Sequence, residues 1–202
     1  MTIKTALAGA AALLLLAGPA STALAKQPHY SASYAQDRAQ IEDLTARYLF
    51  AIDYFDWDSY AEAFAADGVL EFASGAATGR KDIAALVAKF SERIGQTYHT
   101  EDGKPAKLRH VVLQSMIRVE GKRAWGRTLW LEMANHGPQD TMKMGTYGLY
   151  EDEFKKVDGQ WFIAKRRVLN EFLKNRNSGP NNPVRDADAA ADAYAASVKS
   201  AK

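Results

Sequence analysis

The sequence of 202 residues contains no cysteine. This absence excludes disulfide bonds, thiolate catalysis, cysteine-ligated zinc sites and iron–sulfur clusters. The folded chain must therefore be held together by its hydrophobic core, without covalent cross-links.

An excess of charge of one sign is also lacking, because 26 Lys and Arg residues stand against 24 Asp and Glu residues. Proteins that bind nucleic acid need clustered cations to neutralise phosphates, so nucleic acid is not an expected partner. Hydrophobic residues make up 47% of the chain and charged residues 25%. This composition is typical of a globular protein, and the length predicts one domain.

The strong catalytic and nucleotide-binding motifs are absent as well. The sequence has no phosphate-binding glycine loop, no Gly-x-Ser-x-Gly, no His-Glu-x-x-His and no EF-hand loop. The four histidines, His29, His99, His110 and His136, do not have the paired spacing of metal ligands. We therefore expect no metal and no cofactor, so that any catalysis is acid–base chemistry by side chains.

One long apolar run is present, over residues 6–17. It follows Lys4 and precedes a Gly18-Pro19 break and the small-x-small sequence Ala23-Leu24-Ala25. This order predicts a secretory signal peptide over residues 1–25, cleaved after Ala25. The alternative is a membrane anchor, but the run is short for a bilayer core of about 30 Å. We expect a periplasmic or secreted protein without membrane attachment.

After a leader over residues 26–34, helical patterns precede strand patterns. Apolar residues at three- and four-residue steps predict helices over 35–53, from Asp56 to a stop at Asp67-Gly68, and over 82–94. A strand is expected at 69–73, and four longer strands at 108–120, 123–134, 142–157 and 161–172.

Segregated helices and strands predict an α+β domain over residues 35–172, with three N-terminal helices packed on a curved, mostly antiparallel sheet. We expect residues 173–202 to form a loop and an Ala-rich tail, with a helix over 186–199 that packs against a neighbour.

The strand at 108–120 is apolar on both of its alternating faces. A sheet with one face in water alternates apolar and polar residues, so neither face of this strand should be exposed. We expect the helices to cover one face and a second copy of the chain to cover the other, in a homo-dimer or homo-trimer. The alternative is that the C-terminal tail folds over the sheet.

Two residues stand out as candidates for chemistry. Asp53 is expected at the end of the first helix, where the helix dipole disfavours a carboxylate. His110 lies early in a strand. Taken singly, Asp53 could be an ordinary turn residue and His110 a hydrogen-bonded core histidine.

Together, several landmarks give the chain a family resemblance over about residues 35–172. The sequence resembles the SnoaL-like branch of the nuclear transport factor 2-like superfamily, which implies a cone-like α+β barrel. The residues that carry the resemblance are Ile41-Glu42-Asp43-Leu44, Arg47-Tyr48, Asp53, Phe64, Asp67-Gly68, Gly79-Arg80, Ile83, Arg109-His110, Tyr150, Asp152, Phe154, Asp158-Gly159, Trp161 and Ile163.

The lyases of that superfamily share an aspartate and a histidine at the places of Asp53 and His110. The resemblance implies that Asp53 fixes the tautomer of His110, whose other ring nitrogen removes a proton from the substrate. Tyr48 matches a tyrosine that several of these lyases use as an acid or hydrogen-bond donor. The alternative for Tyr48 is a core aromatic on the buried side of its helix.

Six further residues are candidates for substrate binding. Glu132 needs either a function or an arginine partner such as Arg127 or Arg166, since burying an unpaired carboxylate is costly. Arg166 is a candidate for oxyanion stabilisation or for a structural ion pair. The remaining candidates are Gln114, Asn170, Trp130 and Tyr54.

An aromatic cavity is expected if the large side chains converge, which predicts a hydrophobic, ring-containing substrate. The family resemblance implies a cofactor-independent lyase that eliminates water or cleaves a carbon–carbon bond with loss of formaldehyde; an isomerase is a related possibility. The alternative is a non-catalytic periplasmic binding or assembly module. The residues expected in the cavity are Tyr48, Tyr54, Phe55, Trp57, Phe72, Trp130, Met144 and Tyr147.

Overall fold

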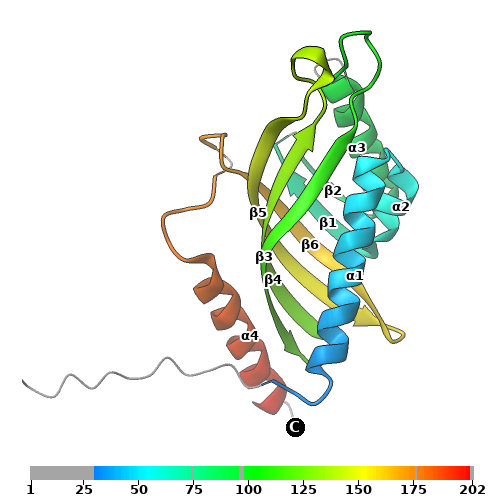
Figure 1. Cartoon of the computed structure of the whole chain (residues 1–202). Helices are drawn as coiled ribbons and strands as arrows, with labels where there is room; N and C mark the ends of the chain where they lie inside the picture. Colours follow the sequence, from blue (N-terminus) through cyan, green and yellow to red (C-terminus); the bar gives the residue numbers. More distant parts are fainter. Residues whose placement is uncertain (1–29, 74, 96–97, 176, 201–202) are drawn as a thin grey trace, which may run out of the picture.

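A computed structural model describes residues 30–73, 75–95, 98–175 and 177–200 (Figure 1). The predicted signal peptide, residues 1–25, and residues 26–29 of the leader lie outside the described residues, so export remains a prediction. None of the described helices is long and apolar enough to cross a membrane.

The described residues form four α-helices and one six-stranded sheet. The helices are α1 (Tyr34–Asp53), α2 (Trp57–Glu62), α3 (Arg80–Gly95) and α4 (Pro183–Ser200), with a short 3₁₀ turn at Pro138–Asp140. The strands are β1 (Phe64–Phe72), β2 (Gly75–Thr78), β3 (Leu108–Glu120), β4 (Arg123–Ala134), β5 (Lys143–Val157) and β6 (Gln160–Asn170).

The sheet has the order β2-β1-β6-β5-β4-β3. Strands β3 to β6 form the predicted antiparallel meander, whereas β1 pairs in parallel with β6. The α+β class and the curved, mostly antiparallel sheet are thus confirmed, but the sheet stays open, with β2 and β3 as its edges. The implied barrel is therefore an unclosed half-cone.

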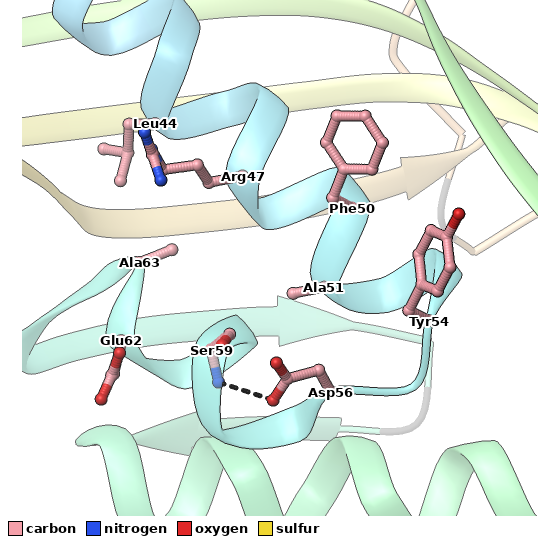
Figure 2. A pocket seen from close by; sticks show the side chains of 9 residues that line it. All are labelled: Leu44, Arg47, Phe50, Ala51, Tyr54, Asp56, Ser59, Glu62 and Ala63. Atoms are coloured by element: carbon pink, nitrogen blue, oxygen red, sulfur yellow. Dashed lines mark hydrogen bonds between the residues drawn. The ribbon is translucent and has the colours of Figure 1, made fainter.

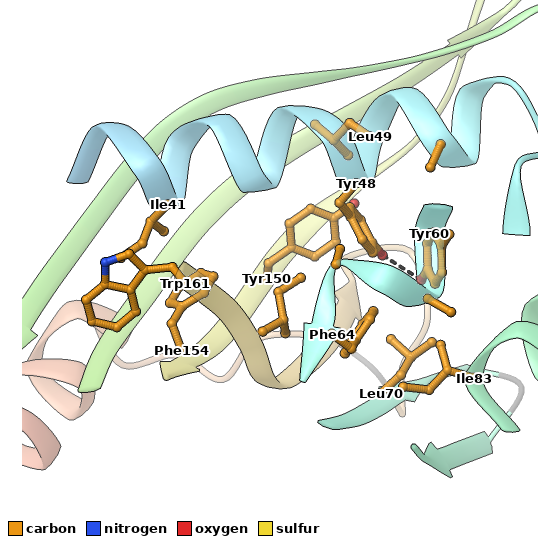
Figure 3. Packing of buried hydrophobic residues seen from close by; sticks show 14 of the residues in the cluster. Ile41, Tyr48, Leu49, Tyr60, Phe64, Leu70, Ile83, Tyr150, Phe154 and Trp161 are labelled. Atoms are coloured by element: carbon orange, nitrogen blue, oxygen red, sulfur yellow. Dashed lines mark hydrogen bonds between the residues drawn. The ribbon is translucent and has the colours of Figure 1, made fainter. Parts of the chain in front are cut away.

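The core lies between the sheet and helices α1 to α3, all on one side of the sheet (Figure 1). Ile41 and Tyr48 of α1 meet Phe154 and Trp161 of the sheet in one buried cluster (Figure 3). Burying aromatic side chains of this size supplies most of the hydrophobic free energy of folding.

Three elements, α2, β1 and β2, differ from the sequence prediction. Helix α2 ends at Glu62, because Phe64 already pairs with Ile163 at the start of β1. The predicted stop at Asp67-Gly68 instead lies inside β1, where the pairing with β6 shifts register. A Cβ atom at Gly68 would lie 2.9 Å from the Phe64 Cβ, so this close approach requires glycine. Strand β2 was not predicted, since its small residues lack an alternating pattern.

Strand β3 contains an irregularity between Val112 and Ser115. His110 before it lines a cavity on the helix side of the sheet, and Ile117 after it packs in the core on that same side. Strict alternation places these two residues on opposite faces. Part of the two-faced apolar pattern therefore reflects a bulge, which shifts the inward parity along the strand.

The outer face of β3 and β4 is partly covered by α4 (Figure 1). Ala187 and Ala191 pack on Trp125 without any exposure, and Arg118 pairs with Asp188 and Asp192. The alternative that the tail folds over the sheet thus holds for this region. The homo-oligomer remains a prediction.

Asp37 anchors the first turn of α1 to the sheet. Its buried carboxylate accepts hydrogen bonds from Lys156 Nζ at 2.7 Å and Trp161 Nε1 at 3.0 Å. Burial acts to raise the pKa of Asp37, but the bonds from Lys156 and Trp161 outweigh it and hold this pKa below its ordinary value of 3.8. Folding therefore stabilises the ionised form of Asp37.

We expect Asp37→Asn to lower the free energy of unfolding at pH 7 by about 1–3 kcal/mol, because the charge-assisted bonds are lost. The depressed pKa of Asp37 makes this contribution complete above pH 4 and lost as the pH falls through the folded-state pKa. Urea unfolding at pH 7 and near pH 2 measures the difference. A gap between wild type and variant that is equally wide at both pH values would contradict this role.

Candidate active site

Asp53 and His110 meet inside the protein, although 57 positions separate them in the sequence. Asp53 is the last residue of α1, and His110 is the third residue of β3. Asp53 Oδ1 lies 2.6 Å from His110 Nδ1, and the Asp53 carboxylate also accepts the backbone N–H of His110 at 3.0 and 3.1 Å. The chain thus brings together the two residues that the resemblance singled out.

This contact sets the chemistry of the imidazole. A carboxylate only accepts hydrogen bonds, so His110 Nδ1 carries a hydrogen, and in the neutral imidazole Nε2 then keeps a lone pair. No described residue forms a hydrogen bond with Nε2. Neutral His110 therefore presents a base whose orientation is fixed by Asp53.

His110 lies on the wall of a cavity of about 330 Å³ between the sheet and helices α1 to α3. Most of the wall is aromatic or aliphatic, and a few polar groups, among them His110, Glu132 and Asn170, interrupt it. Such a cavity suits a small hydrophobic molecule with one or two polar substituents. Five of the eight predicted lining residues are present: Tyr48, Phe55, Trp57, Phe72 and Trp130.

The other three predicted lining residues lie elsewhere. Tyr54, Met144 and Tyr147 are exposed at the surface and do not line the cavity. Tyr54 follows α1 directly, is 64% exposed and packs under the Arg109 guanidinium. The predicted role of Tyr54 in substrate binding is therefore wrong for this cavity, because its ring points outward where the chain leaves α1.

Figure 2 shows Tyr54 beside Phe50 in a separate groove of about 560 Å³ on α1 and α2. This groove is larger and more open than the cavity, yet neither Asp53 nor His110 lines it. Two of the charged residues along it are engaged locally, with Arg47 bonded to Asp43 and Asp56 capping α2 through the Ser59 N–H. We therefore place the candidate active site in the smaller cavity.

Tyr48 lines the cavity and shares its hydroxyl with a second tyrosine. The Tyr48 and Tyr60 oxygens are 2.7 Å apart, and both side chains are buried (Figure 3). Burial raises the pKa of Tyr48 and raises that of Tyr60 well above its ordinary value, so both hydroxyls keep their protons. One hydrogen joins the two oxygens, which leaves the other available to a ligand. No function was predicted for Tyr60 from the sequence.

Arg166 is fully buried behind this tyrosine pair. It donates two hydrogen bonds to Asp152, at 2.7 and 2.8 Å, and its guanidinium lies 4.2 Å from the Tyr48 ring and 4.3 Å from the Tyr150 ring. Burial lowers the pKa of Arg166, but the Asp152 carboxylate outweighs burial and raises it above its ordinary value. Arg166 does not line the cavity, so it is a structural cation, not the predicted oxyanion binder.

We expect Asp152→Ala to cost about 3–5 kcal/mol in the free energy of unfolding, because it leaves a buried guanidinium without its counter-ion. Chemical denaturation followed by circular dichroism measures this loss. The double variant Asp152→Leu/Arg166→Met should recover much of it, since the unpaired charge is then gone. A single variant as stable as the wild type would show that the pair does not carry this weight.

Glu132 lines the cavity beside His110. The two residues are paired in the register of the adjacent strands β4 and β3. Its carboxyl group accepts hydrogen bonds from the Tyr98 hydroxyl and from Thr146. The predicted arginine partners are wrong: Arg166 pairs with Asp152, and Arg127 donates to the Gly126 carbonyl. Tyr98 was not predicted as a site residue, because it lies in a loop without periodic pattern.

The remaining candidates separate clearly. Asn170 and Trp130 line the cavity, with Asn170 Oδ1 accepting the N–H of Phe172 at 3.1 Å. Gln114 is exposed and does not line the cavity, because the irregularity in β3 between Val112 and Ser115 breaks the alternation that connects it to His110. Among the described residues, no three His, Asp or Glu side chains lie close enough to hold a metal ion.

With this geometry established, comparison with known proteins gives the family. The sequence profile of the SnoaL-like domain matches residues 33–167. The chain belongs to the SnoaL-like family. A comparison with curated proteins gave no match.

Solved structures show the same fold as this SnoaL-like domain. A protein of unknown function from Mycobacterium tuberculosis is 26% identical, with 81% of this chain and 88% of that chain covered and a TM-score of 0.58. A protein described as a putative scytalone dehydratase from Novosphingobium aromaticivorans is 22% identical, covering 74% and 97%, with a TM-score of 0.57. A protein from Catenulispora acidiphila in complex with S-DNPA is 23% identical, covering 68% and 96%, with a TM-score of 0.57.

Proposed function

We propose that this SnoaL-like protein is a cofactor-independent lyase that acts on a hydrophobic, ring-containing small molecule. The 2.6 Å contact between Asp53 and His110 Nδ1, on the wall of a largely apolar cavity, carries this proposal. It gives the base a fixed tautomer and an Nε2 without a hydrogen-bond partner among the described residues, in largely apolar surroundings.

In the proposed reaction, His110 Nε2 takes a proton from a substrate carbon. The electron pair of the broken C–H bond forms a double bond as the leaving group departs with its own pair. His110 becomes an imidazolium, and the Asp53 carboxylate at 2.6 Å stabilises this positive charge. The apolar wall strengthens that attraction by lowering the local dielectric constant.

A hydrogen-bond donor for the departing or carbonyl oxygen is supplied by the Tyr48 and Tyr60 pair. Both tyrosines line the cavity, and their hydroxyls stay protonated, since burial raises the pKa of each. Arg166 keeps Tyr48 in place by stacking on its ring. A donor held in advance lowers the cost of developing negative charge on oxygen.

The aromatic wall supports the substrate class. Phe55, Trp57, Phe72 and Trp130 present ring surfaces that favour a flat apolar ligand. A SnoaL-like neighbour of the same fold holds a small ligand, S-DNPA. In the proposed dehydration, the departing hydroxide takes the proton from the His110 imidazolium and leaves as water. In the carbon–carbon alternative, His110 takes the O–H proton of a hydroxymethyl substituent. The C–C bond pair stays on the substrate carbon, which takes that proton back, and formaldehyde departs.

We expect purified protein, incubated with an extract of aromatic metabolites and no added cofactor, to convert a compound into a product lighter by water or formaldehyde. High-resolution mass spectrometry measures this change. His110→Ala and Asp53→Asn should each lower the rate by about 100-fold or more, since the base is lost or its tautomer is no longer fixed.

His99→Ala and Asp43→Asn serve as matched controls, because both residues are exposed and neither lines the cavity. Both controls should turn over substrate at the wild-type rate. Folded His110→Ala protein with full activity would eliminate the proposed base. A wild-type protein that binds metabolites and converts none of them would favour a binding module instead.

A further inference from the structure

We propose that Glu132 selects ligands that carry a hydroxyl group, by accepting a hydrogen bond from that hydroxyl. This inference rests on the proposed function and narrows its substrate class to hydroxylated ring compounds. Glu132 lines the cavity and is only 5% exposed.

The two oxygens of the Glu132 carboxyl group have unequal surroundings. Oε2 accepts the Tyr98 hydroxyl at 3.2 Å and both the N–H and the hydroxyl of Thr146 at 3.3 Å. Oε1 is buried and has no hydrogen-bond partner within the described residues. All three donors that bond this carboxyl group thus hold one oxygen and leave the other with unused acceptor capacity.

No cation compensates this carboxyl group. Among the described residues, no Lys, Arg or His lies within ion-pair distance of Glu132. A buried polar oxygen without a donor costs about 1–3 kcal/mol, which a ligand donor would recover.

The position of Glu132 relates this acceptor to the base. His110 and Glu132 are direct partners in the β3–β4 register, and residues so paired have Cβ atoms about 5 Å apart. A ring held with a C–H bond at His110 therefore has a neighbouring substituent within reach of Glu132.

A second unpartnered group favours a hydroxyl over other donors. Trp130 lies two residues before Glu132 on the same face of β4, lines the cavity, and its buried Nε1 has no partner among the described residues. A hydroxyl both donates and accepts hydrogen bonds, so it can serve a carboxyl oxygen and an indole N–H together. An ammonium group donates only, and an ether accepts only.

Three residues keep the Glu132 carboxyl in place. Tyr98 remains a donor, because burial and then the charge of Glu132 raise its pKa to about 12. Thr146 contributes two donors from β5. Gly145 leaves room for the carboxyl group, since a Cβ atom there would overlap it. These are positioning residues for Glu132.

The test compares two probes, 2-naphthol and its methyl ether 2-methoxynaphthalene, by protein-detected NMR titration of the full chain. The probes share a ring system, and only the naphthol can donate. We expect wild type to bind 2-naphthol about tenfold more tightly, which corresponds to one recovered hydrogen bond.

Glu132→Gln should abolish or reverse this preference. The three donors around Oε2 require the amide oxygen at that position, so the amide NH₂ takes the place of Oε1 and presents a donor. Gly145→Ala should also abolish the preference, because the displaced carboxyl keeps its chemistry but loses its position. Gly95→Ala, where a Cβ meets no atom within 4 Å, should leave it unchanged.

Equal affinity of wild type for the two probes, no binding of either, or an unchanged preference in Glu132→Gln would each overturn this assignment. His110→Ala distinguishes it from the proposed function, since that variant should lose turnover and still prefer 2-naphthol. If His110→Ala loses turnover but the wild type shows no preference for 2-naphthol, the roles of Asp53 and His110 are supported and the role of Glu132 is refuted.

Discussion

The buried ion pair between Arg166 and Asp152 is the interaction on which the rest of the structure depends. Its guanidinium lies against the rings of both Tyr48 and Tyr150, so one cation joins α1 to β5 and β6 in the centre of the sheet. Tyr48 is five residues before Asp53 on the same helix. The packing of Tyr48 on Arg166 therefore fixes the position of α1 on the sheet. The position of Asp53 at the end of α1, and with it the orientation of His110, depends on this packing.

The sequence predicted the regular parts of this fold well. Helices α1 and α3 and strands β3 to β6 have strong periodic patterns, and local pattern governs such elements. It could not predict β2, whose small residues form a strand only because β1 offers them a partner. The irregularity at Val112 to Ser115 was also hidden, since pairing with β4 defines it.

The site residues that lie on regular helices and strands could be predicted from the sequence. Asp53 and His110 lie at a helix end and on a strand, and the resemblance placed both. Tyr54 and Gln114 were misplaced, because single-residue orientation depends on a turn and on a bulge. Tyr98 was missed, since a loop residue gains its role only by meeting Glu132, 34 positions further along the chain.

Asp53 binds the main chain of residue 110 as well as its side chain. The carboxylate at the end of α1 therefore keeps one hydrogen-bond donor, the backbone N–H, for any residue other than proline at position 110. At position 110 the backbone N–H attaches the strand to the helix end, whereas the side chain supplies the chemistry. In evolutionary terms, a lineage with this arrangement can exchange its base without first rebuilding the junction, which gives one scaffold a route to different reactions.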